Sequence, residues 1–527
     1  MRLKNRMPAV GWMIAFGLCF ASTSPTAANG EVVRGVVFHD RDGDATRDPD
    51  EQGLADVGVS NGRDVVRTGP DGRYELPLDD DDIVFVIKPR NYMTPVDRNN
   101  VPRFCYVHKP AGSPKHLKYA GVAPTGPLPA SVDFPLVSRE EPDQFNVVVF
   151  GDPQTRNIRE IDYLAHDVVD EVIGVDAAFG ISLGDIMFDN LSLYGPYNAV
   201  MSAIGIPWHN IHGNHDMNYD VDDDEMADET WERVYGPPTY SFDWGPVHFI
   251  AIDGVMYEGQ ANRRRYHCEF GRHLTFVEND LKHVPDERLV VLLMHIPLVE
   301  ATDLAKLFAL LRNRPYTLSL AAHWHTHQQF FLDSSHGWPG PKPHHVVVAA
   351  TACGSWWQGA PDERGIPHAT MSDGGPNGHY IVRFSGHDYT IRFKAARRPA
   401  DEQMAIHAPP RVRSGRTGGV EVLVNVYAGS ERSIVQMRVG KSTPWRPMNA
   451  ANRPDPFFTA IKASEKGKNP PNGRKLPKAE NSAHLWSARL PENLAVGGHV
   501  IEVRTRDMFG QTWTARRVIE VEGRSRH

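Results

Sequence analysis

The strongest constraint on the fold is the central block, residues 143–397, in which short apolar runs alternate with amphipathic stretches. The apolar runs have the length of buried strands and lie at 146–150, 178–183, 208–211, 248–252, 289–294, 318–321 and 345–350. The amphipathic stretches have helical periodicity and lie at 158–173, 273–282 and 301–312. Such alternation is typical of sheets covered by helices. It therefore predicts an α/β (α+β) core with stacked, mixed β-sheets flanked by helices.

Two blocks rich in turns flank the central block. Residues 31–137 and residues 409–524 contain short segments in which apolar and polar residues alternate, as in half-buried strands. Each block therefore predicts an all-β sandwich domain. The Pro- and Gly-rich stretch 123–135 is expected to be a linker. Residues 462–478, rich in Lys, Pro, Gly and Asn, form either a solvated loop or a basic contact for an anionic surface.

The N-terminus has the features of an export signal. Basic residues precede the apolar run 9–21, and Thr26 and Ala28 fit the −3 and −1 positions of a cleavage site. We therefore expect a signal peptide at 1–28 and a periplasmic or secreted mature protein. The alternative is an uncleaved anchor helix. No later stretch is long and apolar enough to predict a transmembrane segment after signal cleavage.

The charge balance narrows the classes of partner. The 527-residue chain, long enough for about three domains, has a net charge of −8. This charge gives no general attraction to nucleic acid or anionic lipid, and there is no nucleic-acid-binding signature. Any anionic substrate would therefore need a local positive charge, which a bound metal could supply.

Cysteine usage gives little guidance. Cys105, Cys268 and Cys353 would remain after signal cleavage, so at most one disulfide can form, and its pairing is open. Their spacing is not of the metal-binding type.

Five polar motifs follow directly on strand candidates of the central block. They are Gly151-Asp152-Pro153-Gln154, Gly184-Asp185, Gly213-Asn214-His215-Asp216, Met294-His295 and Ala322-His323-Trp324-His325. In α/β folds, ligands bind beyond the carboxyl ends of strands. Carboxylate, amide and imidazole groups together suit divalent metals. The motifs therefore predict a metal site at one edge of the core.

The order of these motifs resembles that of the calcineurin-like metallophosphoesterases, whose pattern is D-x-H, G-D, G-N-H-[DE], H and G-H-x-H. Residues 240–245, 354–357 and 373–378 look like those of a bacterial subgroup with an N-terminal β-sandwich and a C-terminal metallophosphoesterase-associated domain. The resemblance implies a four-layer core with mixed sheets and two divalent metal ions, either Fe, Mn, Zn or Mg.

The resemblance also implies residue roles. Asp185 would bridge the metals, Asp152 and His325 would hold the first, and Asn214, His295 and His323 would hold the second. The metals would generate a hydroxide that attacks phosphorus in line. His215 would protonate the leaving oxygen, and Asp216 would orient His215 or stabilise its charge.

Two positions depart from the family pattern. Gln154 stands where the first motif has His, so it either ligates the first metal through its amide oxygen or leaves a place for water. Ala322 stands where the last motif has Gly, and the run continues to His327. We favour His323 and His325 as the ligand pair over His325 and His327, because the second choice puts Trp324 where backbones approach closely.

Other side chains could line the pocket. The candidates, which either contact substrate or pack within loops, are Asp189, Asn190, Tyr194, Trp356, Trp357, Asp373 and Asn377. The aromatic residues among them could stack on a base or sugar. His212 is expected to be structural.

The N-terminal block contains a second metal signal. Asp40, Asp42, Asp44, Asp48 and Glu51 occupy positions 1, 3, 5, 9 and 12 of a calcium-loop pattern. Ala45 replaces the glycine expected at position 6, which strains the turn. The loop either binds structural Ca²⁺ or is a solvated acidic loop.

We therefore expect an exported, two-metal hydrolase of a phosphomonoester or phosphodiester. One alternative is a catalytically weak protein of the same fold that binds glycan or contacts the cell envelope through its sandwich domains. Another is the same centre acting on a sulfate ester or a lipid-linked pyrophosphate.

Overall fold

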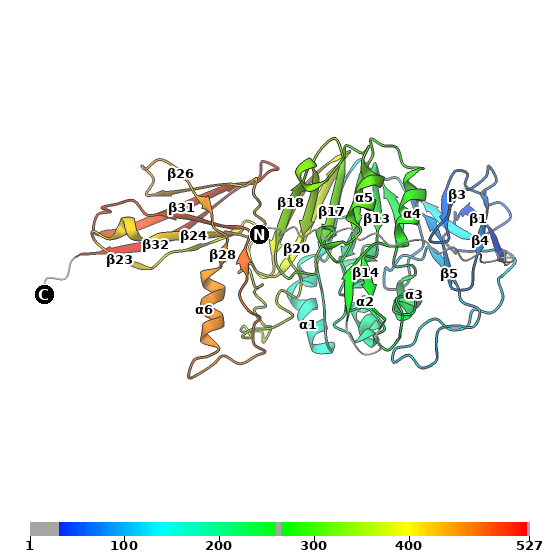
Figure 1. Cartoon of the computed structure of the whole chain (residues 1–527), viewed down its shortest axis with the longest axis horizontal. Helices are drawn as coiled ribbons and strands as arrows, with labels where there is room; N and C mark the ends of the chain where they lie inside the picture. Colours follow the sequence, from blue (N-terminus) through cyan, green and yellow to red (C-terminus); the bar gives the residue numbers. More distant parts are fainter. Residues whose placement is uncertain (1–30, 260–264, 524–527) are drawn as a thin grey trace, which may run out of the picture.

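The computed structural model describes residues 31–259 and 265–523. The expected signal peptide, residues 1–28, lies outside the described residues. Figure 1 shows the N-terminal sheets in blue and the C-terminal sheets in orange and red on opposite sides of the central core. No helix in the described part of the chain is long and apolar enough to cross a membrane.

Two mixed sheets form the core. The five-stranded sheet has the order β11 (Trp208–Asn210), β10 (Phe179–Ser182), β9 (Gln144–Phe150), β20 (Gly378–Ser385) and β21 (Asp388–Ala395). The six-stranded sheet has the order β12 (Tyr240–Trp244), β13 (Val247–Ala251), β16 (Leu289–Leu293), β17 (Thr317–Ala321), β19 (His344–Val348) and β18 (Gln328–Leu332). Strands β9 to β11 run parallel, as do β13, β16, β17 and β19, whereas the remaining strands pair antiparallel.

The two core sheets pack face to face. Side chains alternate along a strand, so the two faces of β9 enter different clusters. Val147 and Val149 join the cluster that contains Phe249 of β13, whereas Val148 and Phe150 join a cluster built with helices. The helices of this second cluster are α1 (Ile158–Asp167) and α2 (Tyr194–Met201), with α3 (Glu229–Tyr235) contributing Trp231 and Tyr235.

Helices also cover the six-stranded sheet. Strand β16 is buried along its whole length, which requires cover on both faces. Helices α4 (His273–Leu281) and α5 (Leu304–Leu311) place Phe276 and Leu307 in the same hydrophobic cluster as β16. The layers are thus helices, sheet, sheet and helices, and the expected core of mixed sheets flanked by helices is confirmed.

The N-terminal region forms two four-stranded sheets. Their orders are β4 (Arg73–Leu78), β1 (Glu31–His39), β8 (Phe134–Ser138), β6 (Tyr92–Met93), and β3 (Val65–Arg67), β2 (Gly58–Ser60), β5 (Asp82–Ile87), β7 (Cys105–His108). A buried ion pair joins this region to the core. Nζ of Lys88 lies 2.5 Å from Glu141 and donates to the carbonyl of Asp243 at 2.7 Å.

The C-terminal region contains two larger sheets and a helix. The sheets are β22 (Met404–His407), β24 (Glu421–Val426), β30 (Leu485–Arg489), β27 (Asn449–Ala450), and β23 (Arg411–Arg413), β32 (Thr512–Glu522), β31 (Gly497–Arg506), β25 (Ile434–Val439), β26 (Arg446–Pro447). Two short pairs are β28 (Arg453–Pro454) with β29 (Asn481–Ser482), and in the core β14 (Val255–Tyr257) with β15 (Tyr266–Cys268).

The expectation that residues 409–524 are entirely β-structure was wrong at α6 (Pro456–Ser464). Asp455 caps this helix by accepting from the backbone N–H of Phe457 and Phe458, and Pro456 occupies its first turn. The first three residues of the basic stretch 462–478 belong to this helix. All three described cysteines are free thiols.

Candidate metal centre

The predicted ligands meet at one end of the core. Asp152, Asp185 and Asn214 follow the parallel strands β9, β10 and β11, while His295 and His323 follow β16 and β17. Because parallel strands end at the same edge of a sheet, the two sheets together bring these side chains into one place.

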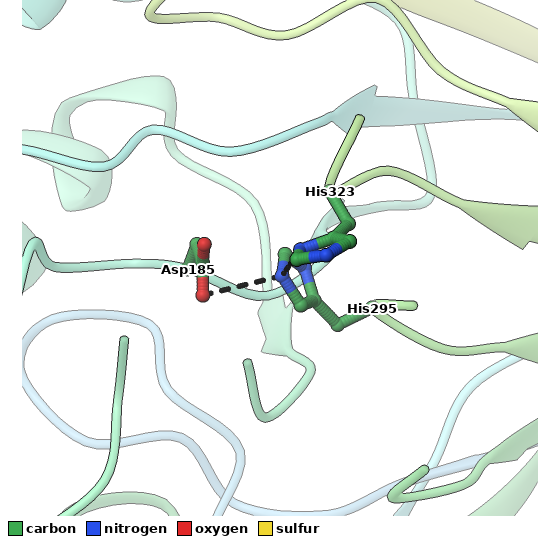
Figure 2. Close-up of side chains that lie close together, drawn as sticks. All are labelled: Asp185, His295 and His323. Atoms are coloured by element: carbon green, nitrogen blue, oxygen red, sulfur yellow. Dashed lines mark hydrogen bonds and ion pairs between the residues drawn. The ribbon is translucent and has the colours of Figure 1, made fainter. Parts of the chain in front are cut away.

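Three of the side chains form a tight cluster, shown in Figure 2. Asp185, His295 and His323 each bring one potential ligand atom to within 4.8 Å of the others. Nε2 of His295 lies 3.2 Å from Oδ1 of Asp185 and 3.1 Å from Nδ1 of His323. Oδ1 of Asn214 approaches the same nitrogen to 3.0 Å.

The surroundings of His295 favour a cation at this point. Its Nδ1 lies 2.9 Å from the carbonyl oxygen of Leu183. A carbonyl only accepts, so Nδ1 carries a proton and Nε2 of the neutral ring presents a lone pair. That lone pair faces oxygen lone pairs of Asp185 and Asn214. A metal ion bound between these atoms would remove the repulsion of the facing lone pairs, because each of the atoms can act as a metal ligand.

The pKa values also indicate that the buried carboxylates require a positive charge beside them. Burial lowers the pKa of His295, but the carboxylates of Asp185 and Asp152 outweigh it and raise the pKa to about 9. Burial opposes ionisation of Asp185, yet His295 and His215 hold its pKa well below the ordinary value. Burial and His295 lower the pKa of His323 to about 4. The charge that the carboxylates require can come from a proton or from a bound cation that displaces it.

A second group of ligands lies beside the first. Nε2 of His325 is 3.0 Å from Oδ2 of Asp152, and Nδ1 of His325 is 2.6 Å from the carbonyl of Gly354. The carbonyl again fixes the proton on Nδ1 and leaves Nε2 as a ligand. Oδ2 of Asp152 is buried and accepts no hydrogen bond from the described residues. These atoms fit a second divalent cation.

Gln154 also lies at this centre. Its side-chain nitrogen donates to Oδ2 of Asp185 at 2.9 Å, and its Oε1 is 3.9 Å from the thiol of Cys353. In this orientation the amide nitrogen of Gln154, and not its amide oxygen, faces the carboxylate of Asp185 and holds that carboxylate in position.

The backbone of the centre is strained. Positive φ angles, which residues other than glycine adopt at a cost, occur at Asp152 (+30°), Gln154 (+37°), Asp185 (+47°), His323 (+69°) and His325 (+53°). Their concentration at the strand ends indicates that geometry here is set by the site and not by local preference.

The structure brings His323 and His325 together with the other ligands and places His327 elsewhere. His327 is buried, with Nδ1 2.7 Å from the hydroxyl of Tyr380. His212, expected to be structural, is buried 3.1 Å from Asp253.

His215 stands at the edge of the centre. Its Nδ1 lies 2.6 Å from Oδ1 of Asp189, and its ring stacks on Phe188 with centroids 4.3 Å apart. Its backbone N–H donates to Oδ1 of Asp185 at 2.8 Å. Burial lowers the pKa of His215, but the carboxylates of Asp185 and Asp189 outweigh it and raise the pKa.

The expected contact of Asp216 with His215 is not what the structure shows. The buried carboxylate of Asp216 accepts from the backbone N–H groups of Ile186, Met187 and Gly213. It also accepts from the hydroxyl of Tyr194 at 3.2 Å, so Tyr194 is part of this packing. Asp189, predicted only as a pocket residue, is the carboxylate beside the His215 ring.

The other predicted pocket residues divide into two groups. Trp356 is half-buried and packs on His325, with ring centroids 4.0 Å apart. Asn190 is half-buried and accepts from Ser192 at 2.7 Å.

Trp357, Asp373 and Asn377 follow the second alternative and pack within loops. All three are buried, because their loops turn toward polar groups of the interior. The partners are the carbonyl of Pro153 for Trp357 (3.0 Å), His484 for Asp373 (2.9 Å) and Asp167 for Asn377 (2.8 Å).

The sequence did not indicate three further groups. The carbonyls of Leu183 and Gly354 orient the imidazoles of His295 and His325, and backbone contacts leave no mark in a residue pattern. Arg156 packs its guanidinium on the ring of Phe188 at 3.8 Å. Its position two residues after Gln154 could have marked it.

The acidic loop of the N-terminal region brings carboxylate oxygens of Asp40, Asp42 and Asp44 within 4.8 Å of one another. Asp40 accepts from the N–H of Ala45 at 3.0 Å, and Ala45 has a φ of +64°, which agrees with the expected strain. Glu51 accepts from the N–H of Asp48 at 3.0 Å. The loop is therefore closed by its own carboxylates.

Comparison with known proteins supports the same class. The family described as the C terminal of calcineurin-like phosphoesterase matches residues 346–513, and the one described as the N terminal of calcineurin-like phosphoesterase matches residues 41–121. No curated protein matches the chain significantly.

Two solved structures share low similarity with the chain. A structure of PhoD has 10% identity and a TM-score of 0.36, covering 70% of this chain and 83% of that one. A purple acid phosphatase from yellow lupin (Lupinus luteus) seeds has 12% identity and a TM-score of 0.34, covering 69% of this chain and 66% of that one.

The mixed-sheet core and its ligand cluster, together with the two family matches, define a metal-dependent phosphoester hydrolase. The chain contains regions that match both the N-terminal and the C-terminal parts of the calcineurin-like phosphoesterases.

Proposed function

We propose that the protein is an exported phosphoesterase that hydrolyses a small phosphomonoester or phosphodiester at a two-metal centre. The observation that carries this proposal is the convergence of Asp185, His295 and His323, with Asn214, on one point beside Asp152 and His325. Two divalent cations bound there would polarise the phosphoryl group and activate water as the nucleophile.

The chain's own residues supply the remaining steps. Asp185, whose Oδ1 lies 3.2 Å from Nε2 of His295, would take the bridging position that the family resemblance implies. Asp152 and His325 would hold one cation, and Asn214, His295 and His323 would hold the other. His215 would donate its proton to the leaving oxygen. The nearby carboxylate of Asp189 holds the ring in place and favours its protonated form. Gln154 would keep the carboxylate of Asp185 oriented.

The proposal extends to the rest of the chain. Residues 1–28 would be removed on export to the periplasm or medium, and the paired sheets on either side of the core would form the two β-sandwich domains. These domains could contact the cell envelope. The loop at Asp40, Asp42 and Asp44 would hold a structural Ca²⁺, because it gathers three carboxylates.

A substrate panel tests the proposed activity. Purified protein would be assayed with aryl and alkyl phosphomonoesters, phosphodiesters, a sulfate ester and a pyrophosphate diester. We expect hydrolysis of phosphoesters that Asp185→Asn abolishes and that the exposed control Asp333→Asn retains. Equal hydrolysis by Asp185→Asn would refute the site, and cleavage of the sulfate ester alone would refute the substrate class.

A further inference from the structure

One segment of the C-terminal region docks beside the metal centre. The backbone N–H of Gly359, just after Trp356 and Trp357, donates to the carbonyl of Arg474 at 2.8 Å. Gly473 has a φ of +120°, and a Cβ there would lie 2.2 Å from the carbonyl oxygen of Gly359. This close approach requires glycine. In Figure 1 the helix α6 that precedes this segment extends from the C-terminal sheets toward the bottom of the view, the same side on which α1 lies in the core.

Two guanidinium groups converge where the segment docks. Nη1 of Arg156 donates to the carbonyl of Trp356 at 2.9 Å, and Nη2 of Arg474 donates to the same oxygen at 3.0 Å. Both groups also pair with Glu160, which lies 3.7 Å from Nη1 of Arg156 and accepts a hydrogen bond from Arg474. Two cations therefore share one carboxylate, which leaves an excess positive charge.

This charge lies next to the reacting groups. The ring of Trp356 packs on His325 with centroids 4.0 Å apart, so the shared carbonyl belongs to a residue that touches a predicted ligand. Arg156 packs on Phe188, and Phe188 stacks on His215. Arg156 thus lies on the side of His215, the side from which the leaving oxygen would be protonated.

Both guanidinium groups retain donors. Within the described parts of the chain, hydrogen bonds use only Nη1 of Arg156 and Nη2 of Arg474. Each guanidinium has five N–H groups, and the side chains are 21% and 44% exposed. Paired arginines with free N–H groups match the oxygens of a phosphate, which they can bind in bidentate fashion.

We propose that Arg156 and Arg474 form an anion subsite for a second phosphate on the leaving group of the substrate. The preferred substrates would then be phosphate esters that carry two phosphates, one cleaved at the metal centre and one held by the arginines. This inference rests on the proposed phosphoesterase function and gives the C-terminal region a part in substrate selection.

The test compares a hexose monophosphate with the corresponding bisphosphate. For wild type we expect the larger kcat/KM with the bisphosphate. Arg474→Gln should lower the ratio of the two kcat/KM values about tenfold, the effect of losing one charge-assisted hydrogen bond. Lys468→Gln, an exposed change in the same segment, should leave the ratio unchanged. An unchanged ratio in Arg474→Gln would overturn the subsite but not the proposed function.

A binding measurement distinguishes a failure of the anion subsite from a failure of the proposed function. Hexose bisphosphate would be titrated calorimetrically into metal-depleted wild type, Arg474→Gln and Arg474→Lys. We expect Arg474→Gln to bind about tenfold more weakly than wild type and Arg474→Lys to lie between them. Equal affinities would overturn the subsite. If wild type hydrolyses no phosphoester of the substrate panel, the proposed function fails and the calorimetric affinities alone decide the subsite.

Discussion

Nε2 of His295 lies 3.2 Å from Oδ1 of Asp185, while Nδ1 of the same ring is engaged by the carbonyl of Leu183. The end of β10 supplies both Leu183 and Asp185, so a three-residue stretch of backbone positions one ligand directly and orients another. This relationship ties the two core sheets together at the site, because His295 follows β16 of the other sheet.

His215→Gln removes the proposed proton donor. We expect a loss of about 10²–10⁴ in kcat for an alkyl phosphate, whose leaving oxygen needs a proton, and a much smaller loss for a nitrophenyl phosphate. Steady-state kinetics with both esters measure the difference. The exposed His166→Gln on α1 is the matched control. Equal losses for the two esters would remove the acid role of His215.

Asp189→Asn tests the carboxylate beside His215. Because that carboxylate raises the pKa of His215, its removal lowers the pKa and deprotonates the ring at a lower pH. The basic limb of the pH–rate profile should therefore move down by about one unit. Asp216→Asn is the comparison variant. It should cost about 1–3 kcal/mol of stability through lost backbone hydrogen bonds without moving that limb. A shift in Asp216→Asn alone would reverse the two assignments.

His248 provides a pH test of stability away from the site. Its ring lies 2.8 Å from Asp243 and 2.9 Å from Asp280. Burial lowers the pKa, but Asp280 and Asp243 outweigh it and raise the pKa to about 9. Because the pKa is higher in the folded state, protonation of His248 stabilises the fold. This stabilisation is fully present below the unfolded-state pKa of about 6.5 and is lost as pH rises toward 9.

The free energy of unfolding should therefore respond to His248→Gln in a pH-dependent way. We expect the destabilisation to be larger at pH 6 than at pH 9.5 by roughly 1–3 kcal/mol. Urea unfolding of wild type and variant at both pH values measures it. A destabilisation that does not change with pH would show that the ring is not charged in the folded protein.

Calcium should stabilise the N-terminal region. Adding Ca²⁺ after chelation should raise the melting temperature of wild type by roughly 3 °C or more. The rise should vanish in Asp42→Asn and persist in Asp50→Asn, since Asp50 shares the loop but is not a predicted ligand. A wild-type melting temperature that does not respond to Ca²⁺ would leave the loop as a solvated acidic turn.

The parts of the fold predicted correctly are those that depend on local pattern. The runs that became β9, β10, β16 and β17 are apolar and short, and the polar residues after them follow the rule for strand ends. Helix α6 was not predicted, because it begins at a capping Asp-Pro pair within a stretch that otherwise has loop composition.

Side-chain partners were predicted less well, because they depend on how loops turn in three dimensions. Asp216 follows His215 in the chain, yet its carboxylate turns inward to backbone N–H groups, and Asp189 from another loop takes the contact. Asp373 was a candidate either to line the pocket or to pack within its loop. Its partner His484 comes from the C-terminal region, and no local pattern connects the two.

Metal analysis tests the central claim most directly. Wild type and Asp185→Asn would be purified without chelator, and transition metals counted by mass spectrometry. Wild type should carry about two ions per chain, as a carboxylate-bridged pair requires, and Asp185→Asn should lose one or both. Wild type without bound metal, or Asp185→Asn with the full content, would contradict the account.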